Sequence, residues 1–234
     1  MKTIGLIGGM SWESSAEYYR IINKEIARRL GGYHSARSLM LSVDFADIEA
    51  LQRQGRWEDA TTQLVQVARQ LERGGADCIV LCTNTMHRMA DAMQRAVTIP
   101  FLHIADATGE RILGQGLTTV GLLATRFTME QDFYRGRLED RYGLTILIPG
   151  DEERQVVHDI IYNELVHGTI HPSSRDAYRR AMANLVARGA EGIILGCTEI
   201  MLLVGQDDSQ VPVFDTTTIH AEAAIHFALT ADAA

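Results

Sequence analysis

A thiol and a hydroxyl occupy matching positions in two short polar segments, where they could give and take protons. The segments LCTNT (81–85) and LGCTE (195–199) each end an apolar run, and aligning them without a gap places Thr83 opposite Cys197. Each loop is expected to follow a strand and precede a helix, so free backbone N–H groups and the positive end of a helix dipole should surround both side chains. This setting predicts a lowered pKa for Cys197 and a cradle for a carboxylate ligand.

A cysteine at the end of a strand also has an ordinary structural explanation, because most such cysteines behave as small buried apolar groups. The polar pair Thr198-Glu199 and the repeated position favour a chemical role for Cys197. Cys82 comes one residue before Thr83. Neighbouring side chains in a strand point to opposite faces, so we expect Cys82 to face the protein interior.

The alignment of the two segments rests on an internal duplication of the chain. Three pairs of segments repeat in the same order at nearly constant spacing: TIGLI (3–7) with TVGLL (119–123), GADCIVL (75–81) with GAEGIIL (189–195), and IPF (99–101) with VPV (211–213). Two copies of one α/β unit are therefore predicted. If a pseudo-two-fold axis relates them, the carboxyl ends of their strands face one cleft, where open parallel sheets bind ligands.

Short apolar runs alternate with longer amphipathic segments, a pattern typical of parallel sheets covered on both faces. Strands are expected at 3–8, 39–43, 78–82, 119–124, 144–149 and 192–196, and helices at 13–30, 56–74, 87–95, 129–141, 151–167, 173–188 and 218–230. The fold class is thus α/β, with two similar Rossmann-like parallel-sheet domains and the active site between them. The first domain is expected to cover 1–100 plus 214–234, and the second 101–213.

Composition excludes several classes of function. A net charge of −8 argues against binding to a nucleic-acid backbone, and no apolar run is long enough to span a membrane. The N-terminus lacks the layout of a signal peptide. Three cysteines, an odd number, form no disulfide framework and favour a reducing cytoplasm. No metal site is expected, and His87, His103 and His220 are interpreted as single structural histidines on different elements.

The whole chain resembles the aspartate/glutamate racemase family, and most resembles the branch typified by the enterobacterial racemase with broad amino-acid activity. The resembling segments are GGMSWESSAEYYR (8–20), CTNTMH (82–87), LLATRFT (122–128) and GCTEI (196–200). The resemblance implies a homodimeric enzyme that interconverts the L- and D-forms of glutamate, aspartate or a related small amino acid. It also implies a two-base 1,1-proton transfer at Cα that needs no pyridoxal phosphate or other cofactor.

This sequence departs from the family at one catalytic position. Family members usually have a cysteine directly before Asn-Thr, whereas here Thr83 precedes Asn84-Thr85. A hydroxyl is a far weaker acid than a thiol, so we expect Thr83 to relay a proton through a neighbour or water. Because the second cysteine serves the L-substrate in the family, Cys197 should deprotonate the L-form and Thr83 should complete the D-form. Turnover from L to D should then be the faster direction, although the equilibrium stays an even mixture.

The remaining candidate residues would bind the substrate. Backbone N–H groups and side chains near Asn84, Thr85 and Thr198 are expected at the carboxylate. Glu199 is either the partner of the substrate ammonium group or an acid in the first turn of a helix. Thr125 is equivalent to Gly9, so the loop with Met10 and the loop with Thr125 should both line the cleft.

The sequence does not indicate which residue recognises the substrate side chain. Family members strict for aspartate have an Arg after the second strand and a Lys before a Gly in the second domain. Here those places hold Ile48-Glu49 and Val166, while Gln52 or a more solvated Arg53 could substitute from the next helical turn. Substrates longer or less acidic than aspartate are therefore expected. Two rival functions stay open: a single-cysteine decarboxylase or isomerase of the same superfamily, and a catalytically silent amino-acid-binding protein.

Overall fold

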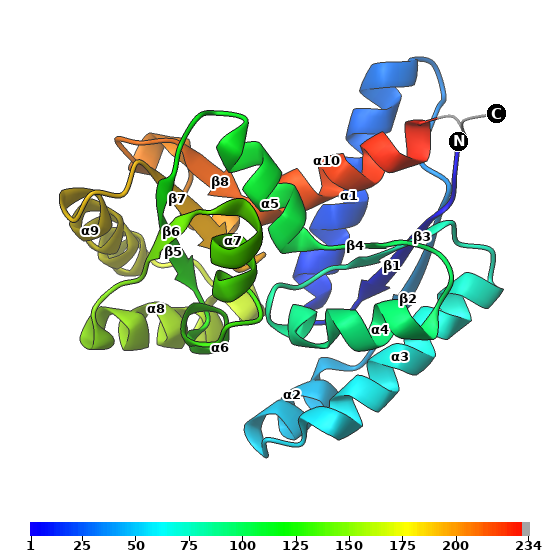
Figure 1. The fold of residues 1–234 in the computed structure, drawn as a ribbon, viewed down its shortest axis with the longest axis horizontal. Helices are drawn as coiled ribbons and strands as arrows, with labels where there is room; N and C mark the ends of the chain where they lie inside the picture. Colours follow the sequence, from blue (N-terminus) through cyan, green and yellow to red (C-terminus); the bar gives the residue numbers. More distant parts are fainter. Residues whose placement is uncertain (231–234) are drawn as a thin grey trace. The chain divides into compact units, whose positions relative to one another are not determined.

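The computed structural model describes residues 1–230, which divide into two compact units. Unit 1 comprises Met1–His103 together with the chain from His220 onward, and unit 2 comprises Ile104–Ile219. The helix α10 (Thr216–Leu229) belongs to both, since it begins in unit 2 and continues into unit 1. Each unit contains one four-stranded parallel sheet with helices around it (Figure 1).

The sheet of unit 1 has the strand order β2-β1-β3-β4, and every neighbouring pair is parallel. The elements in chain order are β1 (Ile4–Gly8), α1 (Trp12–Leu30), β2 (Ser38–Ser42), α2 (Phe45–Arg53), α3 (Trp57–Arg73), β3 (Cys78–Leu81), the 3₁₀ helix η1 (Thr85–Met89), α4 (Ala90–Ala96) and β4 (Phe101–Leu102). Alternate residues of the central strands pack into two separate clusters. Ile7 and Ile79 face α3 and α4, while Leu6 and Val80 face α1 and α10. Both faces of this sheet are therefore covered.

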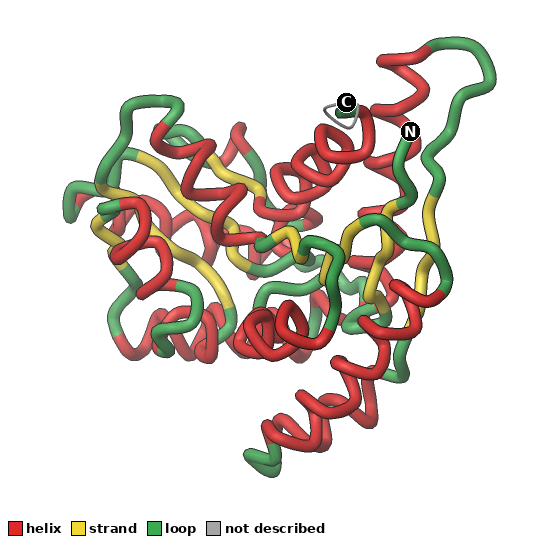
Figure 2. Tube along the Cα trace, turned by 45° about the vertical axis from the view of Figure 1, so that its right-hand side comes forward, coloured by secondary structure: helices red, strands yellow, loops and turns green. Residues whose placement is uncertain are grey.

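The sheet of unit 2 has the equivalent order β6-β5-β7-β8, again with parallel pairs. Its elements are α5 (Ile104–Leu113), β5 (Thr119–Ala124), α6 (Arg126–Glu130), α7 (Arg135–Tyr142), β6 (Thr145–Leu147), α8 (Asp151–Asn163), η2 (Leu165–His167), α9 (Pro172–Ala187), β7 (Gly192–Gly196), η3 (Ile200–Leu202), η4 (Gln206–Asp208) and β8 (Val213–Asp215). The strands lie among helices in both units (Figure 2). The two parallel sheets confirm the predicted α/β fold class. Their equivalent strand order is what the internal repeat of the sequence predicts.

Several elements were not predicted from the sequence. The fourth strands β4 and β8 contain two and three residues and lie outside the longer apolar runs of the sequence. Helices α2 and α5 were also missed. The helix expected at 87–95 is a 3₁₀ turn followed by α4, and the helix expected at 129–141 is divided into α6 and α7. The strand expected at 78–82 is observed as Cys78–Leu81, and the strand expected at 192–196 is observed as Gly192–Gly196.

The turn after β1 requires glycine at one position. Gly9 has a φ of +96°, and a Cβ added there would lie 2.1 Å from the carbonyl oxygen of Val43. We expect Gly9→Ala to lower the free energy of unfolding by about 2–4 kcal/mol, because backbone strain adds to a clash with main-chain atoms. Urea unfolding followed by circular dichroism measures this loss.

Gly31→Ala is the matched control for this prediction. Gly31 also has a positive φ, +73°, but nothing lies within 4 Å of the position its Cβ would take. Its loss of stability should therefore be the smaller, about 1 kcal/mol. Equal losses in the two variants would show that the approach of the Val43 backbone does not restrict Gly9.

Candidate active site

In unit 1, Thr83 lies in a buried loop directly after β3. Thr83 is only 8% exposed, and its backbone N–H donates to the carbonyl oxygen of Leu81 at 2.9 Å. Two side chains hold the carbonyl oxygens on either side of it. Ser14 Oγ donates to the carbonyl of Cys82 at 2.8 Å, and His87 Nδ1 donates to the carbonyl of Thr83 itself at 2.7 Å. The loop conformation is thus fixed by hydrogen bonds from α1 and η1.

The other predicted site residues of unit 1 lie on elements that follow the carboxyl ends of the strands. Asn84 and Thr85 continue the Thr83 loop into η1, and both are buried. Met10 follows β1, whose residue Ile7 pairs with Leu81 at the end of β3. The Met10–Ser11 peptide bond is cis. The carboxyl ends of β1 and β3 therefore bring Met10, Thr83, Asn84 and Thr85 to one edge of the sheet.

Cys82 packs in the interior, which confirms the prediction from strand alternation. It is fully buried in a cluster with Ile4, Leu6 and Tyr18. Desolvation raises the pKa of this thiol, because burial disfavours the charged thiolate. Cys82 is therefore a packing residue, although it adjoins Thr83 in sequence.

In unit 2, Cys197 lies in the loop after β7 and is 7% exposed. Its Sγ donates a hydrogen bond of 2.9 Å to Glu199 Oε2, and the Thr198 hydroxyl donates to the same oxygen at 2.9 Å. Glu199 is itself buried. A carboxylate that accepts from a thiol at this distance is placed to take the thiol proton.

The predicted lowering of the Cys197 pKa is wrong. The pKa of this thiol is raised well above its ordinary value, first by burial and then by the negative charge of Glu199. The expected helix dipole is also weak here, since the loop leads into η3, a 3₁₀ helix of three residues. Glu199 precedes that helix and does not lie in the first turn of an α-helix. The resting group is therefore a neutral thiol with an acceptor beside it.

The start of α10 holds the Cys197 loop in unit 2. Thr216 Oγ1 donates to the carbonyl of Leu195 at 2.8 Å, and Thr217 Oγ1 lies 3.5 Å from the carbonyl of Thr198. Both threonines are fully buried. The carbonyls of residues 195 and 198 on either side of Cys197 therefore have side-chain donors, whereas in unit 1 the donors hold the two carbonyls that directly flank the Thr83 Cα.

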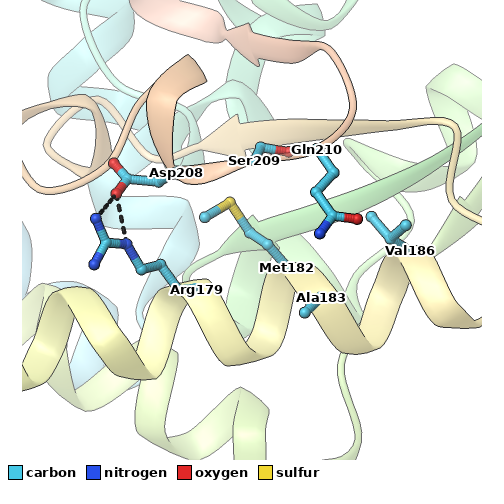
Figure 3. Close-up of a pocket in the computed structure, with 7 residues that line it drawn as sticks. All are labelled: Arg179, Met182, Ala183, Val186, Asp208, Ser209 and Gln210. Atoms are coloured by element: carbon cyan, nitrogen blue, oxygen red, sulfur yellow. Dashed lines mark hydrogen bonds and ion pairs between the residues drawn. The ribbon is translucent and has the colours of Figure 1, made fainter.

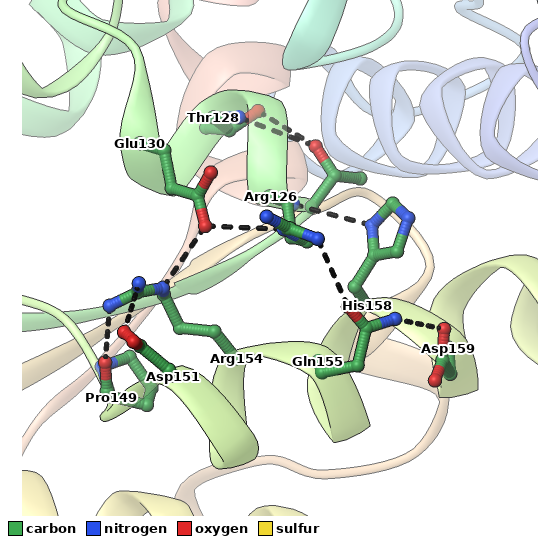
Figure 4. Close-up of polar contacts among 10 residues, drawn as sticks. Arg126, Thr128, Glu130, Pro149, Asp151, Arg154, Gln155, His158 and Asp159 are labelled. Carbon is green, nitrogen blue, oxygen red and sulfur yellow. Dashed lines mark hydrogen bonds and ion pairs between the residues drawn. The ribbon is translucent and has the colours of Figure 1, made fainter. Parts of the chain in front are cut away.

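Thr125 lies at the same sheet edge as Cys197, because Ala124 at the end of β5 pairs with Gly196 at the end of β7. Thr125 caps α6, and its Oγ1 lies 3.2 Å from the hydroxyl of Thr128. A polar network joins α6 to α8 just beyond this cap (Figure 4). Arg126 contacts Gln155 and Glu130, and Glu130 also accepts from Arg154. These contacts fix the position of the Thr125 loop against α8.

The candidate residues for recognition of the substrate side chain have distinct environments. Gln52 is buried on α2, whereas the side chain of Arg53 is 73% exposed and only loosely paired with Glu49 at 3.9 Å. Solvation of Arg53 was predicted and is confirmed. Ile48 is fully buried, and Val166 packs against the core of unit 2. Of Gln52 and Arg53, only Gln52 is buried.

A separate pocket of about 240 Å³ lies in unit 2 between α9 and the chain before β8 (Figure 3). Arg179 and Asp208 form an ion pair at its rim, and Met182 and Val186 supply apolar surface. None of its seven lining residues is a predicted site residue.

Sequence reasoning missed a cluster of histidines in unit 1. His87, His103 and His220 come from different elements, as predicted, but their rings converge. The ring centroid of His87 lies 4.7 Å from that of His103 and 5.6 Å from that of His220. Nothing in the spacing of these three histidines along the chain signalled their convergence. Within residues 1–230, no group of three or more His, Cys, Asp or Glu side chains could hold a metal ion, and no helix is long and apolar enough to cross a membrane.

Comparison with known proteins identifies the class of protein that this fold and these loops define. A candidate Asp/Glu racemase from Yersinia pestis, solved by crystallography, is 54% identical with a TM-score of 0.92, and the match covers 98% of this chain and 100% of that chain. An aspartate racemase homologue from Pyrococcus horikoshii OT3 is 37% identical with a TM-score of 0.85, over 98% of this chain and 100% of that chain. The Yersinia match agrees with the expected enterobacterial branch.

Sequence comparison gives the family. The broad specificity amino-acid racemase of Bacillus subtilis (strain 168) is 25% identical over 162 residues, which are 69% of this chain and 69% of that protein. Residues 7–224 match the family described as Asp/Glu/Hydantoin racemase. The chain belongs to this family, and its homologues are named amino-acid racemases, which are isomerases.

Proposed function

We propose that this protein is a cofactor-independent racemase that inverts Cα of L-glutamate, L-aspartate or a related small amino acid. The observation that carries the proposal is the hydrogen bond from the Cys197 thiol to the buried Glu199 carboxylate, 2.9 Å long. This hydrogen bond places a proton acceptor directly beside the Cys197 thiol. The equivalent position of the repeat holds Thr83, a hydroxyl on a loop fixed by hydrogen bonds. We propose that Thr83 and Cys197 serve opposite faces of Cα.

The proton transfers balance as follows. Glu199 takes the thiol proton, and the Cys197 thiolate removes the α-proton from the L-substrate, which restores the thiol. The Thr83 hydroxyl gives its proton to the opposite face of the carbanion and recovers one from water, while Glu199 returns its proton to water. Solvent therefore gives one proton and receives one. Because its hydroxyl ionises far less readily than a thiol, Thr83 is a poor base for the D-substrate, so kcat should be higher from L to D. The ratio kcat/KM stays equal in the two directions, because the free enantiomers have equal energy.

Substrate binding would favour this transfer. The substrate ammonium group would add a positive charge beside Cys197, which stabilises a thiolate. Backbone N–H groups and side chains of Asn84, Thr85 and Thr198 would bind the α-carboxylate, whose negative charge grows in the transition state. Met10 and Thr125, on the loops after β1 and β5, would complete the binding residues.

The substrate range is proposed to include glutamate and to extend beyond aspartate. The buried amide of Gln52 can donate to a side-chain carboxylate or amide, whereas the exposed Arg53 contacts solvent and Glu49. A neutral amide discriminates less strongly between acidic and neutral side chains than a charged arginine does. The broad specificity of the Bacillus subtilis relative is in keeping with this proposal. On the family resemblance alone, we also propose a cytoplasmic homodimer.

The proposed function is tested with L-glutamate and L-aspartate in heavy water. Loss of the α-proton signal together with formation of the D-enantiomer supports the racemase. Binding of either amino acid without exchange would instead indicate a silent binding protein. Release of carbon dioxide from substituted malonates, without racemisation, would indicate a decarboxylase.

The Thr83 side of the reaction gives a prediction about direction. We expect Thr83→Cys to raise kcat from D-glutamate to L-glutamate by about tenfold or more. A thiol, with an ordinary pKa near 8.5, forms a basic anion near neutral pH far more readily than a hydroxyl does. Circular dichroism of the amino acid measures both directions. Thr83→Val is the control, since it is similar in size and has no hydroxyl, and it should lose inversion in both directions. Full inversion activity in Thr83→Val would remove Thr83 from the mechanism.

A further inference from the structure

We propose that His87 is the positioning residue of the Thr83 side of the reaction: its imidazole sets the direction of the Thr83 side chain through the backbone. This inference rests on the proposed function and adds to it a residue that has no contact with substrate. Its basis is the hydrogen bond from His87 Nδ1 to the carbonyl of Thr83, 2.7 Å long, in a buried setting.

The direction of a side chain follows from the two peptide planes that meet at its Cα. The plane before Thr83 is held at both ends, since the Cys82 carbonyl accepts from Ser14 Oγ and the Thr83 N–H donates to Leu81. The plane after Thr83 carries the carbonyl that accepts from His87. With both planes anchored, φ and ψ of Thr83 are fixed, and so is the bond from Cα to Cβ.

The surroundings of His87 hold its ring in place. A carbonyl oxygen can only accept, so Nδ1 of His87 carries the hydrogen. The ring packs edge-on against His103 and Phe101, with centroids 4.7 Å and 5.4 Å away. These contacts restrict rotation about the side-chain torsions, which keeps the donor aimed at Thr83.

His220 completes the cluster as a neutral ring. Its Nε2 donates to the carbonyl of Leu102, and its Nδ1 accepts from the Tyr18 hydroxyl, each at 2.8 Å. Burial lowers the pKa of His220 to about 4, so the ring carries no charge at neutral pH. His220 therefore packs beside His87 without charge repulsion between the two rings.

The second unit supports a positioning role for such donors. There the Cys197 loop has donors from α10, namely the hydroxyls of Thr216 and Thr217. The two loops at equivalent positions of the repeat are therefore both held through their carbonyls, but by different side chains from different elements. Loss of His87 should leave the donors of the Cys197 loop unchanged.

The experiment separates the two proton transfers. Inversion of L-glutamate needs Cys197 and Thr83, whereas loss of HCl from 3-chloro-L-glutamate needs only removal of the α-proton by Cys197. The eliminated enamine becomes an imine, which water hydrolyses to 2-oxoglutarate and ammonia. We expect His87→Leu to lower inversion by about 10- to 100-fold, since misplacement of a catalytic group by about 1 Å has effects of this size. Elimination should stay within about twofold of the wild-type rate, because the Cys197 loop keeps its own donors.

Two further variants make the test specific. His87→Asn keeps an N–H donor at the position of Nδ1 and should restore most of the inversion. Tyr18→Phe removes a hydrogen bond elsewhere in the same buried cluster and should leave the ratio of inversion to elimination unchanged. If His87→Leu does not fold, His87→Gln replaces it, because its amide is displaced from the Nδ1 position and should give the same split.

The outcomes are distinct. An equal loss of both reactions in His87→Leu or His87→Gln, or no loss of inversion in them, overturns the positioning role while leaving the racemase intact. A His87→Asn variant that loses as much inversion as His87→Leu also overturns it, since the N–H donor would then not be what matters. A change of the ratio in Tyr18→Phe equal to that in His87→Leu also overturns it, since the effect would then belong to packing. A wild-type protein that performs neither reaction would count against the proposed function itself.

Discussion

Replacing Cys197 by alanine is expected to lower deprotonation of L-glutamate by about 10⁴-fold, the upper end of the range for a positioned acid–base group. The Cys197 sulfur is the atom that would receive the α-proton, and no other thiol in unit 2 can replace it, since Cys78 and Cys82 lie in the core of unit 1. Both inversion of L-glutamate and elimination from 3-chloro-L-glutamate should be lost. This double loss differs from the split expected for His87, because Cys197 serves both reactions.

Cys82→Ala is the matched control for this variant. It removes a second buried thiol that adjoins Thr83 in sequence but packs with Ile4, Leu6 and Tyr18. We expect a loss of stability of about 1–2 kcal/mol from the small cavity and nearly unchanged turnover. A large fall in inversion for Cys82→Ala, with normal unfolding, would assign the second catalytic role to Cys82.

Much of the fold was predictable because the chain repeats itself. The echo of TIGLI (3–7) in TVGLL (119–123) marks β1 and β5, the two strands that hold equivalent central positions in the sheets. The six other strands lie in apolar runs long enough to recognise. The fourth strands escaped prediction, because a strand such as Phe101–Leu102 has no period to detect and depends on pairing with its neighbour.

The candidate site was predictable in residue type but not in electrostatics. The repeat selected Thr83 and Cys197, and strand alternation correctly turned Cys82 inward. The pKa of Cys197 was predicted in the wrong direction, since a strand followed by a polar segment suggested a helix N-terminus. The loop instead turns back so that Glu199, two residues later, accepts from the thiol. Such a turn depends on the Thr216 and Thr217 contacts, which come from the far end of the sequence.

Glu199→Gln is expected to have two opposite effects, one on the thiol and one on turnover. Inversion of L-glutamate at neutral pH should fall by about 10²-fold or more, because the amide cannot take the thiol proton. The thiol itself should become easier to ionise, because the substitution removes the negative charge that helps to raise the pKa of Cys197. Glutamine has nearly the size of glutamate and can still accept from Cys197 and Thr198, so packing of the loop is retained.

Alkylation by iodoacetamide reports the ionisation of the thiol without catalysis. A thiol with a raised pKa stays protonated as pH rises through the ordinary range, so the wild-type alkylation rate should increase only on the alkaline side. In Glu199→Gln the charge of the carboxylate is gone while burial remains, so the midpoint should move to lower pH yet stay above that of a free cysteine. Cys197→Ala supplies the background from the other two thiols, whose pKa values are raised by burial.

The combination of the two effects separates proton acceptance from simple electrostatics. If Glu199 acted only by repelling the thiolate, removing its charge would enlarge the thiolate fraction and inversion at neutral pH would become faster. If Glu199 accepts the thiol proton, inversion becomes slower although the thiol ionises more easily. Faster alkylation with slower inversion is therefore the expected pair of results. Faster alkylation with faster inversion would limit Glu199 to raising the pKa of Cys197, and Cys197 would then lose its proton to another group.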